Sequence, residues 1–281
     1  RDLHSFPTRR SSDLWSCTLL NGTNCTVRYY AQSQPSQRAG TDPLYLTQWY
    51  LKNTGRLTGY SGLAAGEDLQ VENVWASGLR GENIRVAVVD DALEVTHQDL
   101  APNVVEGASY NYVSDGSWQR GSPWPLPCTS SQTHGTAVGG VVAARDSNGL
   151  GGRGVAPRAS LVGYNVLAND LDSEVLDALV RDQGKNHIYN NSWGAEDDGH
   201  FNTPASRSAQ VGTILNGLRN GRNGLGSIYT FAGGNGGANG DYSVLDGNVS
   251  MLGAIPVCGT NAAGKRAPYS EPSSKDRKSV V

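Results

Sequence analysis

The chain has 281 residues, of which 37% are hydrophobic and 17% are charged, and its formal net charge is −3 at pH 7. A chain of this length can bury one large core, and its acidic balance gives no basic surface that would argue for a nucleic-acid partner. No apolar run approaches the roughly 18 residues of a membrane-spanning helix. We therefore expect a folded unit that neither binds nucleic acid nor crosses a membrane.

Both ends of the sequence resemble translated read-through of sequencing adapters. These ends are residues 1–14 and 276–281, and segments of foreign origin are left out of reasoning about the fold. Residues 15–40 are rich in Ser, Gln and Asn without a clear period, which indicates a linker or the remnant of a pro-segment. The sequence therefore predicts a single domain over residues 41–275.

The cysteines bear on the cellular compartment. Cys17 and Cys25 are close enough in sequence to staple a short loop, which suits an oxidising compartment. The alternative is that these two and the remaining cysteines, Cys128 and Cys258, are all unpaired thiols. No spacing of Cys and His residues suggests zinc.

Predicted strands and helices alternate along the domain. An apolar, β-branched run over 84–90 is typical of a buried strand in a parallel sheet. Further strands are predicted over 160–167, 186–191, 226–232 and 249–259, and helices over 68–78, 134–145, 172–183 and 204–220. The alternation predicts a layered α/β fold with a parallel sheet.

The predicted helix at 134–145 is rich in glycine. Val138, Val141, Val142 and Ala144 suit a buried helix. Gly135, Gly139 and Gly140 are poor helix formers but would allow a close approach to the sheet. Packing, rather than helix propensity, must therefore stabilise this helix.

Asp90 and Asp91 end the first predicted strand, at the edge where open α/β sheets place their ligands. A carboxylate there needs a partner to offset its desolvation, and His134 is the candidate. Asp first and His second is the chain order of one type of catalytic triad, in which Ser comes third, and histidine has a reference pKa that suits a general base. Strand phase alone does not separate Asp90 from Asp91, and Asp90 is chosen by its position in the motif described next. The alternatives are capping carboxylates, a surface histidine, or a metal-dependent phosphoryl-transfer site.

Four segments follow one another in an order that carries a family resemblance. They are Val89-Asp90-Asp91, His134-Gly135-Thr136, Asn191-Ser192-Trp193-Gly194-Ala195-Glu196-Asp197-Asp198-Gly199 and Phe231-Ala232-Gly233-Gly234-Asn235-Gly236-Gly237. Over about residues 41–271 the chain resembles the catalytic domain of subtilisin-like serine proteases, and most closely the kexin and furin branch. The resemblance implies a three-layer α/β fold with a mostly parallel central sheet.

One expected motif is absent. The family's nucleophilic Ser, in a Gly-Thr-Ser-x-Ala-Ala-Pro-like segment, appears nowhere in the 281 residues. We therefore expect a fragment that is incomplete at its C-terminus and catalytically inactive as it stands.

The resemblance assigns roles to the residues of the four segments. It implies that Asp90 and His134 activate the nucleophile, and that Asn235 donates to the oxyanion, a contact worth about 3–4 kcal/mol. The alternative for Asn235 is a residue chosen for a left-handed turn. The Ser192-Trp193-Gly194 segment would pair with the substrate as an added strand.

The resemblance also implies a preference for basic substrates. Asp91 would be the acid of the pocket for P2, the second residue before the cut, and Asp197 and Asp246 would lie at the base of the pocket for P1. Carboxylates there favour Lys or Arg through charge-assisted hydrogen bonds. Ser131 and Val180 stand where furin carries further acids, so we expect a strong basic preference at P1, a weaker one at P2 and little at P4. Alternatively, these acids only bind metal or cap turns.

Two calcium positions are implied in the same way, since calcium prefers carboxylate, amide and carbonyl oxygens. The first would use Asp42, Asp99, Asn148 and the carbonyls of Arg145, Leu150 and Gly152. The second would use Asp197, Asp241 and Glu271. The alternative for each acid is a solvated surface residue.

The expected function is a calcium-dependent serine endopeptidase, secreted or periplasmic, that cuts protein or peptide substrates after basic residues and has a pro-peptide as a further partner. The competing hypothesis is a pseudoprotease that binds peptides without cutting them. A phosphoryl-transfer domain would leave the segments around His134, Ser192 and Asn235 unexplained.

Overall fold

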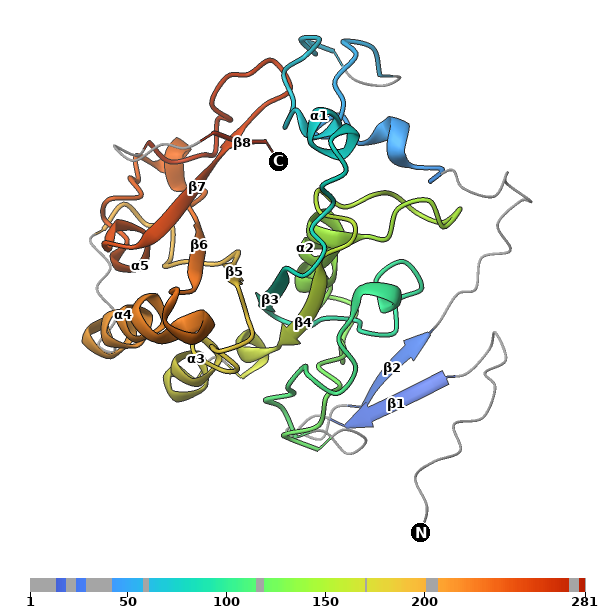
Figure 1. The fold of residues 1–281 in the computed structure, drawn as a ribbon. Coiled ribbons are helices and arrows are strands. Elements are labelled where there is room, and N and C mark those ends of the chain that lie inside the picture. The colour runs from blue at the N-terminus through green and yellow to red at the C-terminus, as the bar shows by residue number, and fades with distance from the viewer. Residues whose placement is uncertain are drawn as a thin grey trace.

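The computed structural model describes residues 14–18, 24–28, 42–57, 61–114, 119–169, 171–200, 207–272 and 278–280. A parallel sheet with strand order β4-β3-β5-β6-β7-β8 forms its centre (Figure 1). Its strands are β3 (Arg85–Val89), β4 (Ser160–Tyr164), β5 (Ile188–Asn191), β6 (Ile228–Ala232), β7 (Ala254–Thr260) and β8 (Lys278–Val280). All neighbouring strands in this sheet run parallel, as the sequence predicts.

The strand order creates a switch point beside β3. The chain passes from β3 to β4 on one side and then returns to β5 on the other side of β3. In open α/β sheets, ligands bind in the crevice outside the carboxyl ends of the strands at such a point. The segments that follow β3 and β5 therefore lie where a site is expected.

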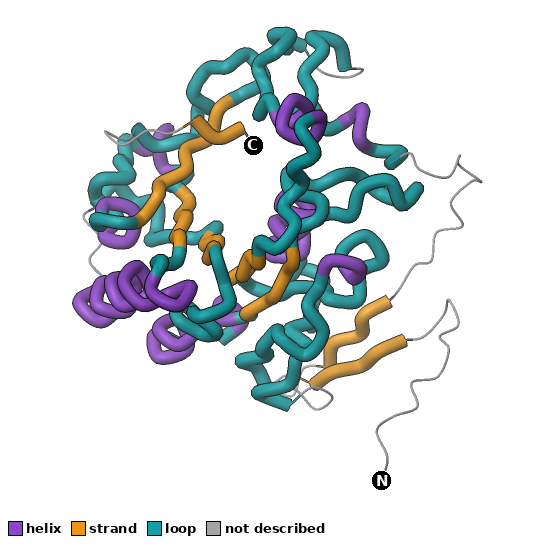
Figure 2. The backbone as a smooth tube through the Cα atoms, in the orientation of Figure 1, coloured by secondary structure: helices purple, strands orange, loops and turns teal. Residues whose placement is uncertain are grey.

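Helices cover both faces of the sheet, which confirms the three-layer α/β prediction (Figure 2). Side chains of a strand alternate between the faces, and Ala87 and Val89 pack in one core cluster while Val86 and Val88 pack in another. The first cluster includes residues of α3 (Asp172–Ala178), α4 (Arg207–Gly224) and α5 (Gly247–Ser250). The second includes residues of α2 (His134–Ala143), and a separate small cluster holds α1 (Val71–Ala76).

The packing of α2 corrects one expectation. The buried residues of this helix are Gly135, Gly139 and Ala143, spaced four residues apart, whereas Val141 is 44% exposed. A Cβ atom on Gly139 would lie 2.8 Å from Leu93 Cδ1. The stripe facing the sheet is therefore made of small residues, and the prediction that Val141 suits the buried side was wrong. The prediction that Gly140 allows a close approach to the sheet was also wrong, since a Cβ there would meet no atom within 4 Å.

Short 3-10 helices connect the larger elements. They are η1 (Tyr45–Thr47), η2 (Ala101–Asn103), η3 (Val166–Ala168) and η4 (Gly236–Asn239). The strand predicted over 249–259 begins only at Ala254, because α5 occupies its first residues and Asp246 caps that helix by accepting a hydrogen bond from the Asn248 backbone N–H. The first residues of the predicted helix at 204–220 lie outside the described residues.

The N-terminal segment contains an antiparallel hairpin of β1 (Leu14–Thr18) and β2 (Asn24–Arg28), in the region expected to be a linker or pro-segment remnant. Its register sets Cys17 opposite Cys25, which is compatible with the predicted disulfide. The adapter origin of the two ends, the domain boundaries and the disulfide stay predictions.

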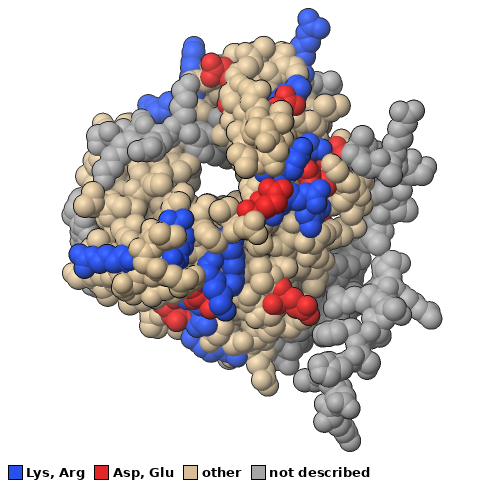
Figure 3. Space-filling view, in the orientation of Figure 1, with Lys and Arg blue, Asp and Glu red and all other residues tan. Residues whose placement is uncertain are grey.

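The surface carries charge of both signs. On the face shown in Figure 3, acidic and basic side chains lie in small groups among uncharged residues, and the surface is hollowed at its centre. None of the helices in the described part of the chain combines the length and apolarity that a bilayer crossing requires.

Candidate active site

The carboxyl end of β3 and the first residue of α2 form a hydrogen-bonded acid and base. Asp90 is 1% exposed, whereas 57% of the His134 side chain is exposed. His134 Nδ1 lies 2.9 Å from Asp90 Oδ1 and 3.1 Å from Oδ2. An ionised carboxylate can only accept, so Nδ1 donates and Nε2 is the ring nitrogen left to take a proton. The partner predicted for Asp90 is therefore the one that the fold provides.

Burial shapes the electrostatics of this pair. Burial raises the pKa of Asp90 above its ordinary value, and the hydrogen bond from His134 opposes that rise. The Asp91 backbone N–H also donates to Asp90 Oδ1, at 2.8 Å. The two hydrogen bonds stabilise the ionised carboxylate in a buried position, where it can orient the imidazole.

Asp91 binds the start of α2. Its Oδ1 accepts a hydrogen bond from the Gly135 backbone N–H at 2.8 Å, and its Oδ2 accepts one from the His134 backbone N–H at 3.2 Å. These N–H groups at a helix start have no partner within the helix, and the helix dipole favours a negative charge there. Asp91 therefore fixes the backbone that carries the imidazole, and its predicted role toward substrate stays a prediction.

The Ser192-Trp193-Gly194 segment follows β5 and is attached to the neighbouring strand ends. Trp193 Nε1 donates to the Val89 carbonyl at 2.9 Å. The indole ring packs edge-on against Phe231, with ring centroids 5.6 Å apart. Because Val89 immediately precedes Asp90, these contacts hold the segment beside the acid and base.

An acid-lined pocket lies beyond this segment. Its walls include Ser192-Trp193-Gly194 and the carboxylates of Asp197, Asp241, Asp246 and Glu271. The other lining residues are Ala195, Glu196, His200, Ala232, Gly234 and Asn235. Concentrated negative charge in a cleft attracts cations or cationic side chains.

Asp246 reaches the pocket from the start of α5. Its Oδ1 accepts from the Asn248 backbone N–H at 2.7 Å, and its Oδ2 accepts from the Ala195 backbone N–H at 3.2 Å. A Cβ on Gly194 would lie 2.9 Å from Asp246 Oδ2. A glycine at this position therefore allows the carboxylate to approach the segment closely.

Asn235 follows the end of β6, at the same edge of the sheet as Asp90. It lies at the N-cap position of the 3-10 helix η4 without a side-chain capping hydrogen bond, is exposed, and donates its backbone N–H to Asp197 Oδ1 at 3.0 Å. This places it in the wall of the acid-lined pocket. The donation of its side-chain amide to an oxyanion stays a prediction.

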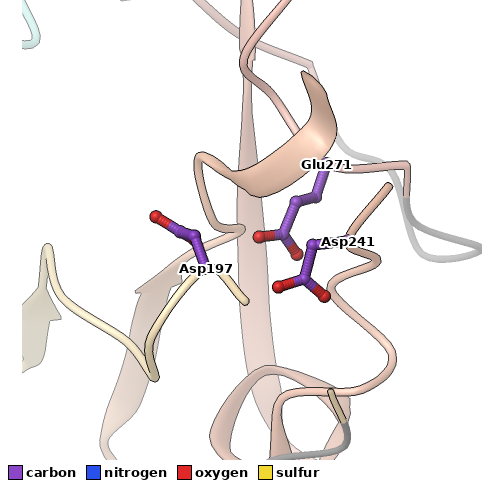
Figure 4. A group of neighbouring side chains, drawn as sticks. All are labelled: Asp197, Asp241 and Glu271. Carbon is purple, nitrogen blue, oxygen red and sulfur yellow. The ribbon is translucent and has the colours of Figure 1, made fainter. Parts of the chain in front are cut away.

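Asp197, Asp241 and Glu271 form a carboxylate cluster whose ligand atoms lie within 4.8 Å of one another (Figure 4). The pKa of Glu271 is raised to about 7, mainly by burial and further by the hydrogen bond with Asp197 and the negative charges of Asp241 and Asp197, while the hydrogen bond from the Gly236 backbone N–H opposes the rise. A divalent cation would offset this repulsion, and an all-oxygen donor set suits calcium. The second predicted set of ligands therefore comes together and fits the ion.

The three side chains of the first predicted set of calcium ligands also come together. Asn148 donates its side-chain N–H to Asp99 Oδ1 at 2.7 Å and its backbone N–H to Asp42 Oδ1 at 3.3 Å. The loop from Arg145 to Gly152 carries Asn148 and the predicted carbonyl ligands of Arg145, Leu150 and Gly152. However, Asp42 also forms an ion pair with Arg153, which the sequence reasoning did not include.

The Subtilase family model matches residues 81–280. The chain belongs to the subtilase family. Neuroendocrine convertase 2 of Caenorhabditis elegans is 38% identical to it over 237 residues, which cover 82% of this chain and 34% of that protein. Furin of Homo sapiens is 38% identical over 237 residues, which cover 82% of this chain and 28% of that protein.

Solved structures agree with this family. A serine protease of Aeromonas sobria, in complex with the chaperone ORF2, superposes with a TM-score of 0.70 and 30% sequence identity, over 88% of this chain and 45% of that chain. The predicted resemblance to kexin- and furin-like subtilases is thereby confirmed. The chain spans about a third of the length of the curated relatives that it matches.

Several contacts of this subtilase site were missed from the sequence. Arg153 and Asp42 are 111 residues apart, and no local pattern links them. Glu196 and His200 line the acid-lined pocket, and only their place in or just after the third motif could have suggested this.

Proposed function

We propose that the protein is a serine endopeptidase and that the 281 residues form part of its catalytic domain. The hydrogen bond between His134 Nδ1 and Asp90 carries this proposal, because it is the arrangement that a serine hydroxyl needs for activation. The nucleophilic Ser would come from chain that is not among these residues.

In the proposed reaction, His134 Nε2 takes the proton of the serine hydroxyl as the hydroxyl oxygen attacks the peptide carbonyl. Asp90 stabilises the imidazolium that forms and keeps Nε2 directed to the reaction. Asn235 donates its side-chain amide to the negatively charged oxygen, and His134 then returns the proton to the leaving amine. The Ser192-Trp193-Gly194 segment holds the substrate backbone by strand pairing.

The proposed specificity is for a basic residue at P1. The acid-lined pocket supports this, because Asp246 lies against the Gly194 backbone and the Asp197 cluster lies nearby. A Lys or Arg side chain would form charge-assisted hydrogen bonds there. Both oxygens of Asp91 already accept backbone N–H groups, which leaves this acid less free to bind substrate and supports a weaker preference at P2.

We also propose that Asp197, Asp241 and Glu271 hold a calcium ion. Such an ion would supply positive charge to the cluster. Asp197 and Glu271 accept hydrogen bonds from the backbone N–H groups of Asn235 and Gly236, so the cluster steadies the turn that carries Asn235.

We propose a secreted or periplasmic location, supported by the relatives and by the Cys17–Cys25 register, and a pro-peptide as a partner.

A peptide-binding pseudoprotease is the second candidate, favoured by the absence of a Gly-Thr-Ser motif from the 281 residues. A serine-directed fluorophosphonate probe on the full-length protein separates the two. We expect the wild-type protein to be labelled and the His134→Ala variant to be labelled far more slowly. No labelling of a folded, full-length wild-type protein would support the binder and contradict the enzyme.

A further inference from the structure

We infer that Arg153 takes the place of a bound cation at Asp42, so that this chain binds calcium at the Asp197 cluster and not at the Asp42 position. The Asp42 side chain is 0% exposed and the Arg153 side chain 17% exposed. Arg153 Nε and Nη2 lie 2.8 Å and 2.7 Å from Asp42 Oδ2. A buried carboxylate requires a nearby positive charge or several donors, and Arg153 supplies the charge.

The guanidinium of Arg153 is fixed in place by the surrounding fold. The backbone N–H of Arg153 donates to Gln48 Oε1 at 2.7 Å, and the backbone carbonyl of Arg153 accepts from Gln48 Nε2 at 2.9 Å. Its Cζ lies 4.6 Å from the ring centroid of Tyr45 and 5.3 Å from that of Trp75. Cation–π contacts of this kind stabilise a partly desolvated cation, so Arg153 is held against Asp42 by more than the ion pair.

One side-chain oxygen on each of Asp42, Asp99 and Asn148, which calcium would need, already accepts a hydrogen bond from the protein. Asp42 Oδ1 accepts from the Asn148 backbone, and Asp99 Oδ1 accepts from the Asn148 side chain. Asn148 Oδ1 accepts from the Leu150 backbone N–H at 2.9 Å. A calcium ion here would have to replace these bonds while lying beside the guanidinium, which repels it.

The Asp197 cluster differs in its charge. It consists of the carboxylates of Asp197, Asp241 and Glu271. Within the described residues, none of these three carboxylates forms an ion pair. The Asp42 position has two carboxylates, and one of them is paired with Arg153. The larger unneutralised charge therefore lies at the Asp197 cluster, which is where a divalent cation gains most.

Isothermal titration of the chain with calcium chloride, after removal of metal with a chelator, tests this inference. We expect one calcium per wild-type chain. Asp241→Asn removes a carboxylate ligand and should abolish this binding. Asp42→Asn keeps an amide oxygen that can accept from Arg153, and it should change the dissociation constant of calcium by less than about twofold. Arg153→Met, which keeps a long side chain but removes the charge, should add a second binding event, and Arg153→Lys should not.

Two calcium ions per wild-type chain, one of them lost in Asp42→Asn, would overturn the inference. The wild-type count is measured without any substitution, and the loss in Asp42→Asn then assigns the second ion to the Asp42 position. If a folded Arg153→Met chain shows no second calcium-binding event, this would also contradict the inference. Loss of calcium binding at the Asp197 cluster is a separate failure, since it would contradict the calcium proposal and leave the assignment of Arg153 standing.

Discussion

Replacing Gly135 with alanine should separate α2 from the sheet and weaken the acid–base pair. A Cβ at this position would lie 2.2 Å from the Ala92 carbonyl oxygen and 2.7 Å from Asp90 Cβ, whereas non-bonded carbon atoms prefer about 3.5–4.0 Å. Relief requires a shift of the helix by about 1 Å, and overpacking of this kind costs about 1–3 kcal/mol. Because His134 is the adjacent residue, the shift should also lengthen its hydrogen bond to Asp90.

Gly140→Ala is the matched control in the same helix. A Cβ there would meet no atom within 4 Å, so alanine should stabilise the helix by about 0.5–1 kcal/mol. Urea unfolding followed by circular dichroism gives the free energy of unfolding of both variants, and the low-field proton NMR signal of His134 Nδ1–H reports the hydrogen bond. We expect Gly135→Ala to be less stable than the control and to lose or shift this signal. Equal stability of the two variants with an unchanged signal would refute the packing argument.

Further predictions concern pH, packing and metal. Burial raises the pKa of Asp90 above its ordinary value of 3.8, so the native state holds this proton more tightly than the unfolded chain. The contribution of protonated Asp90 to the free energy of unfolding is therefore complete below pH 3.8 and is lost as the pH rises through the raised pKa. In urea titrations, the wild-type chain should lose stability relative to Asp90→Asn over this pH range. Parallel pH profiles of the two chains would contradict this. Trp193→Phe keeps an aromatic ring, although a smaller one, but removes the indole N–H that donates to the Val89 carbonyl. This should lower the free energy of unfolding by about 1–2 kcal/mol; a change below about 0.3 kcal/mol would contradict this and show that water replaces the bond. A chelator should lower the melting temperature of the wild-type chain and not that of Asp241→Asn. The reason is that calcium at 100 times its dissociation constant stabilises the folded chain by about 2.7 kcal/mol. Equal shifts of the melting temperature in both chains would contradict this and place the ion elsewhere.

The acid and base could be predicted from the sequence because the physical rules behind them are local. An apolar strand that ends on Asp90 places a carboxylate at the ligand edge of a parallel sheet, and a buried carboxylate needs a partner such as His134. The parallel sheet follows from the alternation of strands and helices, and the family resemblance implied its three-layer arrangement. These features depend on short segments whose patterns are visible in the sequence.

Other features depend on contacts that no local pattern records. The Arg153–Asp42 ion pair joins residues 111 positions apart. The buried face of α2 runs through Gly135 and Gly139 rather than Val141, because the distance between helix and sheet decides which side chains fit. The helix α5 interrupts a predicted strand because Asp246 caps it, and hydrophobic periodicity does not detect a cap.

The central claim is that His134, oriented by Asp90, is the base of a protease that cuts after basic residues. The most direct test is kcat/KM of the full-length protein, wild type and His134→Ala, on two matched peptides with arginine or norleucine at P1. We expect the wild-type protein to prefer arginine by about 100-fold, as hydrogen bonds between charged groups allow, and His134→Ala to lose about 10⁴-fold or more of the rate. Equal cleavage of both peptides, or full activity of a folded His134→Ala protein, would contradict the account.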